Sequence, residues 1–528
     1  MTSAFINSLG NWNPQLLREG RGRLRPRSIA ATILLSMIGQ GLLGLLFSQQ
    51  EEKSVIARWA DLANAITWIL PYVLFSLGAY YLVSDLNQEA KRGTLNFIRL
   101  SPRPSHQILL GKILGVPLLP YLAVVLAMPL HVIAGLKGGM PLPFLASYYL
   151  MLIVGAILLF SLAVLYGLIS SAKALIMGQQ SVAAIAFSAL SLLLFVPLYM
   201  TWQTQITWMP LGINQWFDKQ SDYGYNSRDI TYPIQWFGQT INLNPWISHG
   251  FSLAVMAVAI TLIWAMLMRL FRSPDGVLMS KRQSYAIVAC CEALVVGFLV
   301  VTKANSFQPS PEEGTALLYA FNFALVLMVL LALCPHRLLL LDWLRYRRYP
   351  RRFGPDLVWM DKSPVLVAIA INLAIINALF LPWLLLFGIG KGRTLAALGV
   401  ALCLCVILLI YTAVVQWIFT LKIRNPYMWA FGFLAIWMVV PATVLGILAV
   451  PFETGQTFST LWTVLGYPLG DFSKAGTING VINGVIILSC LLLFWVWQVQ
   501  QRLQVLSLAP LFTQSNVAQL DQSKQEES

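Results

Sequence analysis

Few side chains in this sequence could take part in proton or ion chemistry, because only 11% of its 528 residues are charged and 58% are apolar. Glu292, in the stretch CCEALVVG, is the one carboxylate deep inside a long apolar run. A carboxylate at membrane depth can relay protons or contact a transported substrate. Glu292 lies about two helical turns from one end of its run, and we favour the simpler interpretation that it pairs with Lys281 or Arg282.

Residue types that catalyse reactions are present, but not in patterns that predict an active site. The four histidines lie on different segments: His106, His131, His249 and His336. A metal site needs clustered ligands, and no serine or cysteine lies in a recognisable nucleophile motif. Gly388–Thr394 reads GIGKGRT, which lacks the spacing of a phosphate-binding loop. We therefore expect a chain that is not an enzyme and that binds no metal or cofactor itself.

A polar, basic stretch between two apolar runs carries a second set of signals. Residues 84–112 read SDLNQEAKRGTLNFIRLSPRPSHQILLGK. Lys91 and Arg92 suit a helix C-terminus, where the helix dipole favours cations, and Gly93 can adopt the left-handed conformation that ends a helix. The second membrane helix is therefore expected to continue beyond the membrane as far as Gly93.

A short helix, LNFIRL, is predicted directly after this glycine. Thr94 can cap its N-terminus, and Leu95 and Ile98 lie three residues apart on one face. The predicted product is an amphipathic helix held crosswise below the membrane, and its apolar face needs a partner.

Prolines end this short helix. Ser101-Pro102 and Pro104 stop it, because proline disfavours helix in the residue before it. Ser105 can then cap the third membrane helix, with Lys112 near the same end.

Long apolar runs must position these residues. A bilayer core takes about 20 apolar residues as a helix, and lipid offers the backbone no hydrogen-bond partners, so such runs must be helical. Twelve runs reach this length: 29–48, 60–83, 111–135, 144–170, 175–200, 247–271, 284–302, 315–334, 364–388, 394–420, 427–450 and 480–499. The predicted fold class is an all-α polytopic membrane protein with about twelve transmembrane helices.

The distribution of basic residues predicts the orientation of the chain. Most of the 35 lysines and arginines fall in alternate loops that include the N-terminal segment, and basic loops are retained on the cytoplasmic side. Both termini are therefore expected in the cytoplasm. The net charge of +14 reflects this topology and contact with membrane lipids, and we expect no nucleic-acid partner.

The loops suggest two halves of six helices each. In each half the longest cytoplasmic loop follows the second helix, at 84–107 and 335–363, and the longest external loop follows the fifth, at 201–246 and 451–479. Internal duplication is common in transporters. We therefore expect a first half at 29–275 and a second half at 276–504.

The two ends of the chain lie outside these halves. Residues 1–28 could form an interfacial helix with Leu16 and Leu17 in the headgroup region, or a disordered basic arm, and both interpretations stay open. Residues 505–528 are polar, and we expect a disordered cytoplasmic tail.

The basic stretch resembles part of a known family. An acidic residue and then Glu89, the Arg92-Gly93-Thr94-Leu95 step, Ser101-Pro102 and Gly111-Lys112 look like the first cytoplasmic loop of type-2 ABC exporter permeases. In that family the loop contains the coupling helix, which seats in the ATPase subunit. The resemblance implies that the coupling residues here are Glu89, Arg92, Gly93, Thr94, Leu95, Ile98, Ser101 and Pro102. Residues 335–363 lack an equivalent Glu-Gly-Thr-Leu pattern.

The resemblance also implies a function and partners. The chain would be the permease subunit of an ABC exporter in a bacterial plasma (inner) membrane, moving a lipid, glycan precursor or hydrophobic compound. Two copies of a separate ATPase subunit would bind ATP and Mg²⁺. The alternatives are an ion-coupled secondary transporter, a non-transporting membrane scaffold, and a basic loop that only contacts anionic headgroups.

Residues 201–246 are rich in aromatic side chains, among them Trp208, Trp216 and Trp236. Aromatic rings settle at membrane interfaces, so this segment could lie on the outer leaflet. The resemblance implies an external exit lid instead, and both interpretations stay open. Inside the predicted helices, Asn322, Asn372 and Asn377 are interpreted as helix-to-helix hydrogen-bonding groups.

Overall fold

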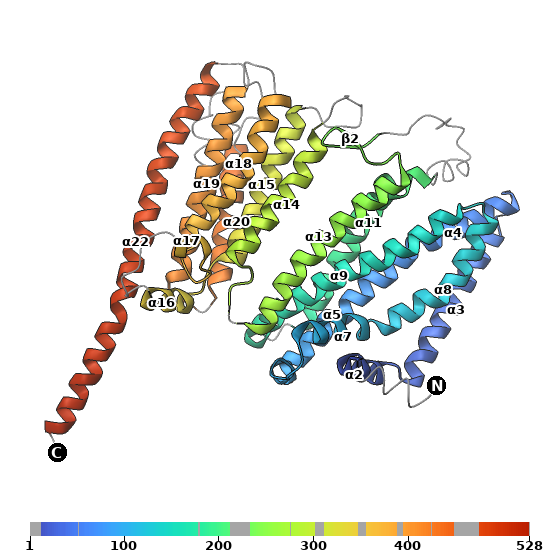
Figure 1. Cartoon of the computed structure of the whole chain (residues 1–528), viewed down its shortest axis with the longest axis horizontal. Coiled ribbons are helices and arrows are strands. Elements are labelled where there is room, and N and C mark those ends of the chain that lie inside the picture. Colours follow the sequence, from blue (N-terminus) through green and yellow to red (C-terminus); the bar gives the residue numbers. More distant parts are fainter. Residues whose placement is uncertain are drawn as a thin grey trace. The chain divides into compact units, whose positions relative to one another are not determined.

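A computed structural model of the chain describes residues 12–50, 52–177, 180–211, 233–274, 276–300, 311–346, 355–387, 394–423, 425–447 and 475–526. Figure 1 shows that the described chain is almost entirely helical. It divides into two compact units. The first unit comprises Met1–Gln235 and Gln239–Pro274, and the second comprises Trp236–Gly238 and Asp275–Ser528. The boundary expected between the two halves, at 275/276, lies next to this division.

The first unit begins with a short helix and continues with long apolar ones. Its α-helices are α2 (Pro14–Arg23), α3 (Pro26–Ser48), α4 (Val55–Pro71), α5 (Gly78–Lys91), α6 (Thr94–Arg99), α7 (Ser105–Gly115), α8 (Leu118–Lys137), α9 (Leu142–Met177), α10 (Gln180–Leu190), α11 (Val196–Trp202) and α13 (Pro245–Arg272). The π-helical segments are η1 (Tyr72–Leu77), η2 (Ser191–Phe195) and η3 (Gln203–Thr207), and η4 (Met209–Leu211) is a 3₁₀ turn. Two short strands, β1 (Gln235–Trp236) and β2 (Gln239–Thr240), form a hairpin.

In the second unit, every described element after residue 275 is helical. Its helices are α14 (Lys281–Leu299), α15 (Pro311–Leu333), α16 (Arg337–Tyr346), α17 (Pro355–Trp359), α18 (Leu366–Phe387), α19 (Thr394–Thr420), α20 (Pro426–Ile447) and α22 (Ala475–Glu526). The backbone of α22 stays helical through the segment 505–526, which we expected to be disordered.

Eleven helices in the described chain are long and apolar enough to cross a membrane. This number agrees with the predicted all-α polytopic fold. Eleven of the twelve predicted runs overlap these helices. The remaining run, 427–450, coincides with the 22-residue helix α20, so the count of twelve stays a prediction.

One long helix connects membrane depth to the basic stretch. Val55–Lys91 is a continuous helical segment of 37 residues, which corresponds to a length of about 55 Å at 1.5 Å per residue. The hydrocarbon core of a bilayer is only about 30 Å thick. The end of this segment therefore has the length to project beyond the membrane, as expected for the second predicted helix. A π-helical segment follows Pro71 inside it.

The predicted third membrane helix is divided into two pieces. Residues 111–135 fall on α7 and α8, which are separated at Val116 and Pro117. Pro117 has no backbone N–H to continue the helical hydrogen-bond ladder, which explains the break at this position. Lys112 therefore lies on the short helix α7 rather than on the membrane helix α8.

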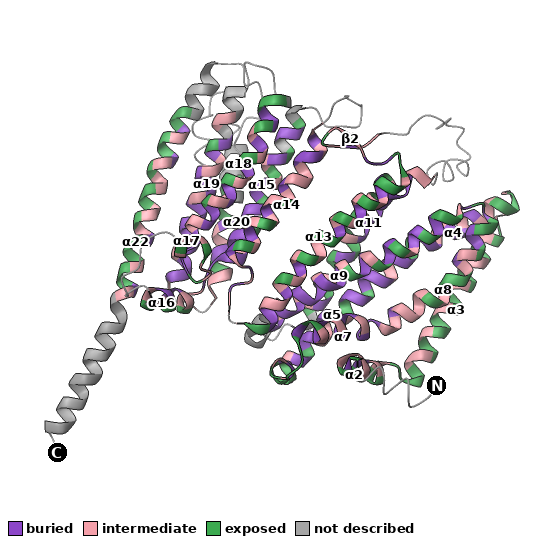
Figure 2. Ribbon diagram, viewed as in Figure 1, coloured by how far each residue is buried: buried purple, intermediate pink, exposed green. Residues whose placement is uncertain are grey.

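Close helix contacts hold the core of the first unit. A Cβ atom added to Gly78 would lie 2.3 Å from Phe160 Cζ, and one added to Gly167 would lie 2.6 Å from Leu86 Cδ1. Small residues allow helices to approach this closely in membrane bundles. In contrast, α3 has no buried residue, and Figure 2 shows exposed positions along it. An apolar helix with exposed side chains is suited to contact with lipid.

The three asparagines make the predicted helix-to-helix hydrogen bonds in the second unit. Asn372 Nδ2 on α18 donates to Ser284 Oγ on α14 at 3.1 Å. Asn322 Nδ2 on α15 donates to Glu292 Oε1 on α14 at 3.3 Å. Asn377 Nδ2 on α18 lies 3.1 Å from Cys405 Sγ on α19.

Candidate functional site: a short helix on a buried ion network

The turn between α5 and α6 has the predicted conformation at Gly93. Its φ is +74°, in the left-handed region that glycine adopts without a steric penalty. Thr94 is the first residue of α6 rather than its cap, because its hydroxyl donates backwards to the Glu89 carbonyl oxygen at 3.2 Å. This bond satisfies an acceptor at the C-terminus of α5, where helical partners are missing.

The side chains of α6 divide into a buried face and an exposed face. Leu95 and Ile98 lie on one face as predicted, but this face is buried within the chain, with 3% and 7% of each residue exposed. Phe97 and Leu100 are 80% and 85% exposed. The apolar side chains available to a partner are therefore Phe97 and Leu100, a pair that the spacing argument missed.

The residues after α6 turn the chain into α7. The helix ends at Arg99, and the bends at Ser101 and Pro102 follow, as predicted. Ser105 is buried as the first residue of α7 and makes no capping bond, while the extended residue Pro104 takes the cap position. The predicted cap at Ser105 is therefore wrong. Arg92 is exposed and lies two residues before the start of α6.

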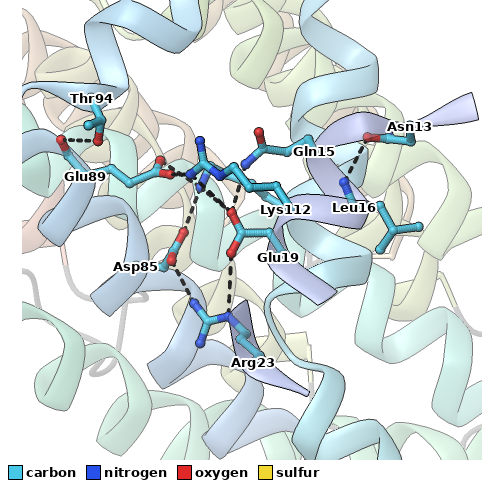
Figure 3. A network of polar contacts seen from close by, with 10 residues as sticks. Asn13, Gln15, Leu16, Glu19, Arg23, Asp85, Glu89, Thr94 and Lys112 are labelled. Carbon is cyan, nitrogen blue, oxygen red and sulfur yellow. Dashed lines mark hydrogen bonds and ion pairs between the residues drawn. The ribbon is translucent and has the colours of Figure 1, made fainter. Parts of the chain in front are cut away.

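Lys112 lies at the centre of a buried ion network (Figure 3). Its side chain is fully buried, and Nζ lies 2.7 Å from Asp85 Oδ2 and 2.7 Å from Glu89 Oε2. A third carboxylate, Glu19, lies 3.7 Å from Nζ. Asp85 and Glu89 are four residues apart, so they share one face of α5. Glu89, which the resemblance placed in the coupling set, is thus engaged within the chain.

Two arginines of α2 complete the network. Arg18 pairs with Glu89, and Arg23 Nη2 donates to Asp85 Oδ1 at 2.7 Å. Arg23 Nε also lies 3.6 Å from Glu19 Oε2. The network therefore contains three carboxylates and three cations, so its formal charge is zero. Charges removed from water are stable only when they are paired in this way.

Glycines bring α2 close to α7. A Cβ on Gly111 would lie 2.6 Å from Asn13 Oδ1, and one on Gly115 would lie 2.7 Å from Glu19 Cβ. Asn13 caps α2 by accepting a bond from Leu16 N at 3.1 Å, and its Nδ2 donates to the Gln107 carbonyl at 2.7 Å. The N-terminal segment thus contains a docked helix, which decides against a disordered arm for Pro14–Arg23.

Burial and charge act in opposite directions on the two groups at the core of the network. Burial alone would lower the pKa of Lys112, but Asp85, Glu89 and Glu19 outweigh it, and the pKa is raised above its ordinary value of 10.5. Burial raises the pKa of Glu19 above its ordinary value of 4.5, against the opposing effect of Lys112. Lys112 is therefore a firmly protonated cation, whereas Glu19 binds a proton more readily than an ordinary glutamate does.

The three carboxylates also have the spacing of a cation site. Oxygens of Glu19, Asp85 and Glu89 lie within 4.8 Å of one another. The ammonium group of Lys112 lies among them, so an internal cation takes the place that a metal ion would need. The role of the arrangement is therefore structural. It holds α6 in place.

Sequence reasoning missed most of this network. Glu19 and Arg23 lie in the N-terminal segment, for which an interfacial helix and a disordered arm both stayed open. Lys112 was placed only near the end of the third membrane helix. The bonds that join Asn13, Arg18 and Arg23 to α5 and α7 span 62 to 94 residues. The i, i+4 pair of Asp85 and Glu89 was the one local signal, since both carboxylates share a helix face.

The three tryptophans predicted for an external lid fall in different parts of the chain. Trp208 is 1% exposed, and its Nε1 donates to Ser147 Oγ at 3.1 Å, so it is part of the core of the first unit. Trp236 belongs to the second unit, where the next residue, Phe237, donates its N–H to the Gly297 carbonyl at 2.7 Å. Trp216 lies outside the described residues. The external lid therefore stays a prediction.

Glu292 does not make the ion pair that we favoured. Lys281 Nζ donates to Ser363 Oγ and to the Leu357 carbonyl, both at 2.6 Å. The guanidinium of Arg282 lies over the Trp359 ring at 5.1 Å. Eleven residues along a helix separate Lys281 from Glu292 by about 16 Å, which is beyond the reach of a lysine side chain.

No protein-family model matches this chain, and no curated protein or solved structure resembles it.

Proposed function

We propose that this chain is the membrane permease subunit of an ATP-driven transporter, and that α6 is the element through which a separate ATPase subunit acts on it. The observation that carries this proposal is the exposed pair Phe97 and Leu100 on a short helix fixed to a buried ion network. An exposed aromatic and leucine pair is suited to insertion into an apolar pocket of a partner, because this would remove their apolar surface from water.

The network explains how force at α6 could reach the membrane helices. Thr94 ties α6 to the last turn of α5, and Lys112, through Glu89, ties the same turn to α7. Movement of α6 would therefore carry α5 with it, and α5 continues into the helical segment Val55–Lys91. A flexible loop would absorb such a push, whereas a braced helix transmits it.

Charges around the exposed pair indicate the character of the partner. Lys91, Arg92 and Arg103 are exposed on the residues that flank α6. Positive charges at the rim of an interface steer a complementary, negatively charged partner. We therefore expect the ATPase surface to be an apolar groove with an acidic rim.

The wider assignment follows the resemblance of residues 84–112. In this proposal α6 faces the cytoplasm of a bacterial cell, two ATPase subunits bind ATP and Mg²⁺, and the cargo is a lipid, a glycan precursor or a hydrophobic compound. Closure of the ATPases would shift the helices of the permease between inward-facing and outward-facing arrangements.

Copurification tests this proposal. The chain would be extracted gently from its native membrane through a C-terminal tag, and stoichiometric partners identified by mass spectrometry. We expect an ATP-binding subunit at about two copies per chain, lost in the double variant Phe97→Asp, Leu100→Asp. The control is Leu142→Asp on α9, which changes a residue that is 63% exposed. Transport by the purified chain alone, or stable association only with proteins that bind no ATP, would contradict the proposal.

A further inference from the structure

Glu292 lies on the buried face of α14. Six of the seven buried residues of this helix recur every three or four positions, at Lys281, Ser284, Val288, Glu292, Val296 and Leu299, and the seventh is Gly297. Glu292 itself is fully buried. Val296, one turn further along, belongs to an apolar cluster with Leu318, Phe380 and Trp383. The carboxyl group therefore lies in surroundings that offer almost no polar contact.

Glu292 and Asn322 share one hydrogen bond, and one further oxygen atom of each side chain remains without a partner. Asn322 Nδ2 on α15 donates to Glu292 Oε1 at 3.3 Å. Glu292 Oε2 and Asn322 Oδ1 are both buried, and neither has a hydrogen-bond partner in the described chain. The nearest cations along α14, Lys281 and Arg282, are engaged with other groups.

A carboxylate in this position would be strongly unfavourable. Burial of an unpaired negative charge costs several kcal/mol or more, whereas a neutral acid with its hydrogen bonds made costs far less. A deprotonated Glu292 would also leave Oε2 and Asn322 Oδ1 as two acceptors without a donor. Buried acceptors are rarely left in this state.

A single proton would satisfy both atoms. We propose that Glu292 is a proton-binding site, and that its neutral carboxylic acid forms a two-bond pair with the Asn322 carboxamide. Oε2–H donates to Asn322 Oδ1, and Oε1 accepts from Asn322 Nδ2. The proton comes from water when the bundle closes around the pair. No covalent bond other than this O–H bond changes.

Other titratable groups near the pair are neutral side chains. Cys291 precedes Glu292 on α14, Tyr319 lies one turn from Asn322 on α15, and α18 carries no titratable residue. Asp356 on α17 and Asp361 after it lie at the Lys281 end of α14, where Asp361 Oδ1 accepts the Lys281 backbone N–H at 3.0 Å. None of these supplies a positive charge to Glu292.

The site gives the second unit a means of exchanging a proton with its surroundings. When the helices of the second unit pack closely around Glu292, its side chain stays a neutral acid. If the helices moved so that water reached Glu292, the proton would be released, because a hydrated carboxylate is stable. This inference does not rest on the proposed ATPase coupling, since it concerns only contacts within the second unit.

Infrared spectroscopy of the full chain in lipid nanodiscs at neutral pH would test the site. We expect the wild type to show a protonated carboxylic acid carbonyl band that is absent in Glu292→Gln and present in the control Glu313→Gln, which alters an exposed carboxylate at the start of α15. In Asn322→Leu the band should remain and move to higher frequency, because the acid loses both amide bonds. Should Glu292→Gln fail to fold, this shift still identifies the acid.

Two results would overturn the proposal. One is a wild-type minus Glu292→Gln difference spectrum that contains carboxylate bands and no acid band. The other is an acid band that Asn322→Leu leaves at the same frequency, which would show that the carboxamide is not its partner.

Discussion

At the scale of single residues, Lys112 is the group on which the first unit most depends. It is the fully buried cation that contacts all three carboxylates of the network. Removal of one partner from a buried ion pair leaves an uncompensated charge, whereas removal of an exposed charge changes little. The sequence alone does not reveal this difference between one lysine and another.

Lys112→Met should therefore destabilise the first unit. The methionine fills a similar volume but leaves Asp85 and Glu89 without their shared cation, at a cost of about 3 to 5 kcal/mol. The free energy of unfolding, followed by tryptophan fluorescence in detergent, would measure the loss. Lys91→Met, at an exposed position, is the matched control and should change it by less than about 0.5 kcal/mol. Equal effects of the two substitutions would show that the network is not a brace.

Glu19 gives the network a predicted pH dependence. Because its pKa is raised in the folded chain, the folded state binds a proton more tightly than the unfolded state does. The stabilisation that this provides is complete below the ordinary pKa of 4.5 and is lost as the pH rises through the raised value. Thermal unfolding of Glu19→Gln, measured against pH, should lack this loss. If the variant and the wild type show the same slope above pH 4.5, Glu19 is not the group responsible.

At the scale of elements, the contact between α2 and α7 depends on the absence of side chains at Gly111 and Gly115. Apolar periodicity predicted most long helices, because it reports which segments must lie in hydrocarbon. It did not predict the docking of α2, since that depends on a capping asparagine, two glycines and ion pairs to residues far away in the chain. Nor did it predict the break between α7 and α8, although Pro117 was visible in the sequence.

Gly111→Ala should separate α2 from α7. The added Cβ would lie 2.6 Å from Asn13 Oδ1 and 2.9 Å from Gln15 Cβ, and overpacking of this kind costs about 1 to 3 kcal/mol. A cysteine at Gln15 should react faster with a water-soluble maleimide in this variant. Gly44→Ala on α3 is the control, because nothing lies within 4 Å of its added Cβ. Unchanged labelling in Gly111→Ala would mean that α2 does not pack as described.

At the scale of the whole molecule, the chain consists of two helical units with unlike polar interiors. The first carries a charge-balanced network beside the exposed residues of α6, and the second carries the hydrogen-bonded pair of Glu292 and Asn322 and a lysine held by carbonyl groups. The repeated positions of the long loops along the sequence suggested two similar halves. The polar groups inside them differ, and in our proposals the first unit contacts a partner and the second binds a proton.

The measurement that tests the central claim most directly is photo-crosslinking from α6 in native membranes. A photoreactive amino acid at Phe97, and separately at Leu142 as the control, would capture whatever contacts each position. The account predicts a covalent adduct between Phe97 and an ATP-binding subunit, strengthened or weakened by added nucleotide, and no such adduct from Leu142. Capture of lipid alone at both positions, or of the same proteins at both, would contradict α6 as the site of ATPase docking.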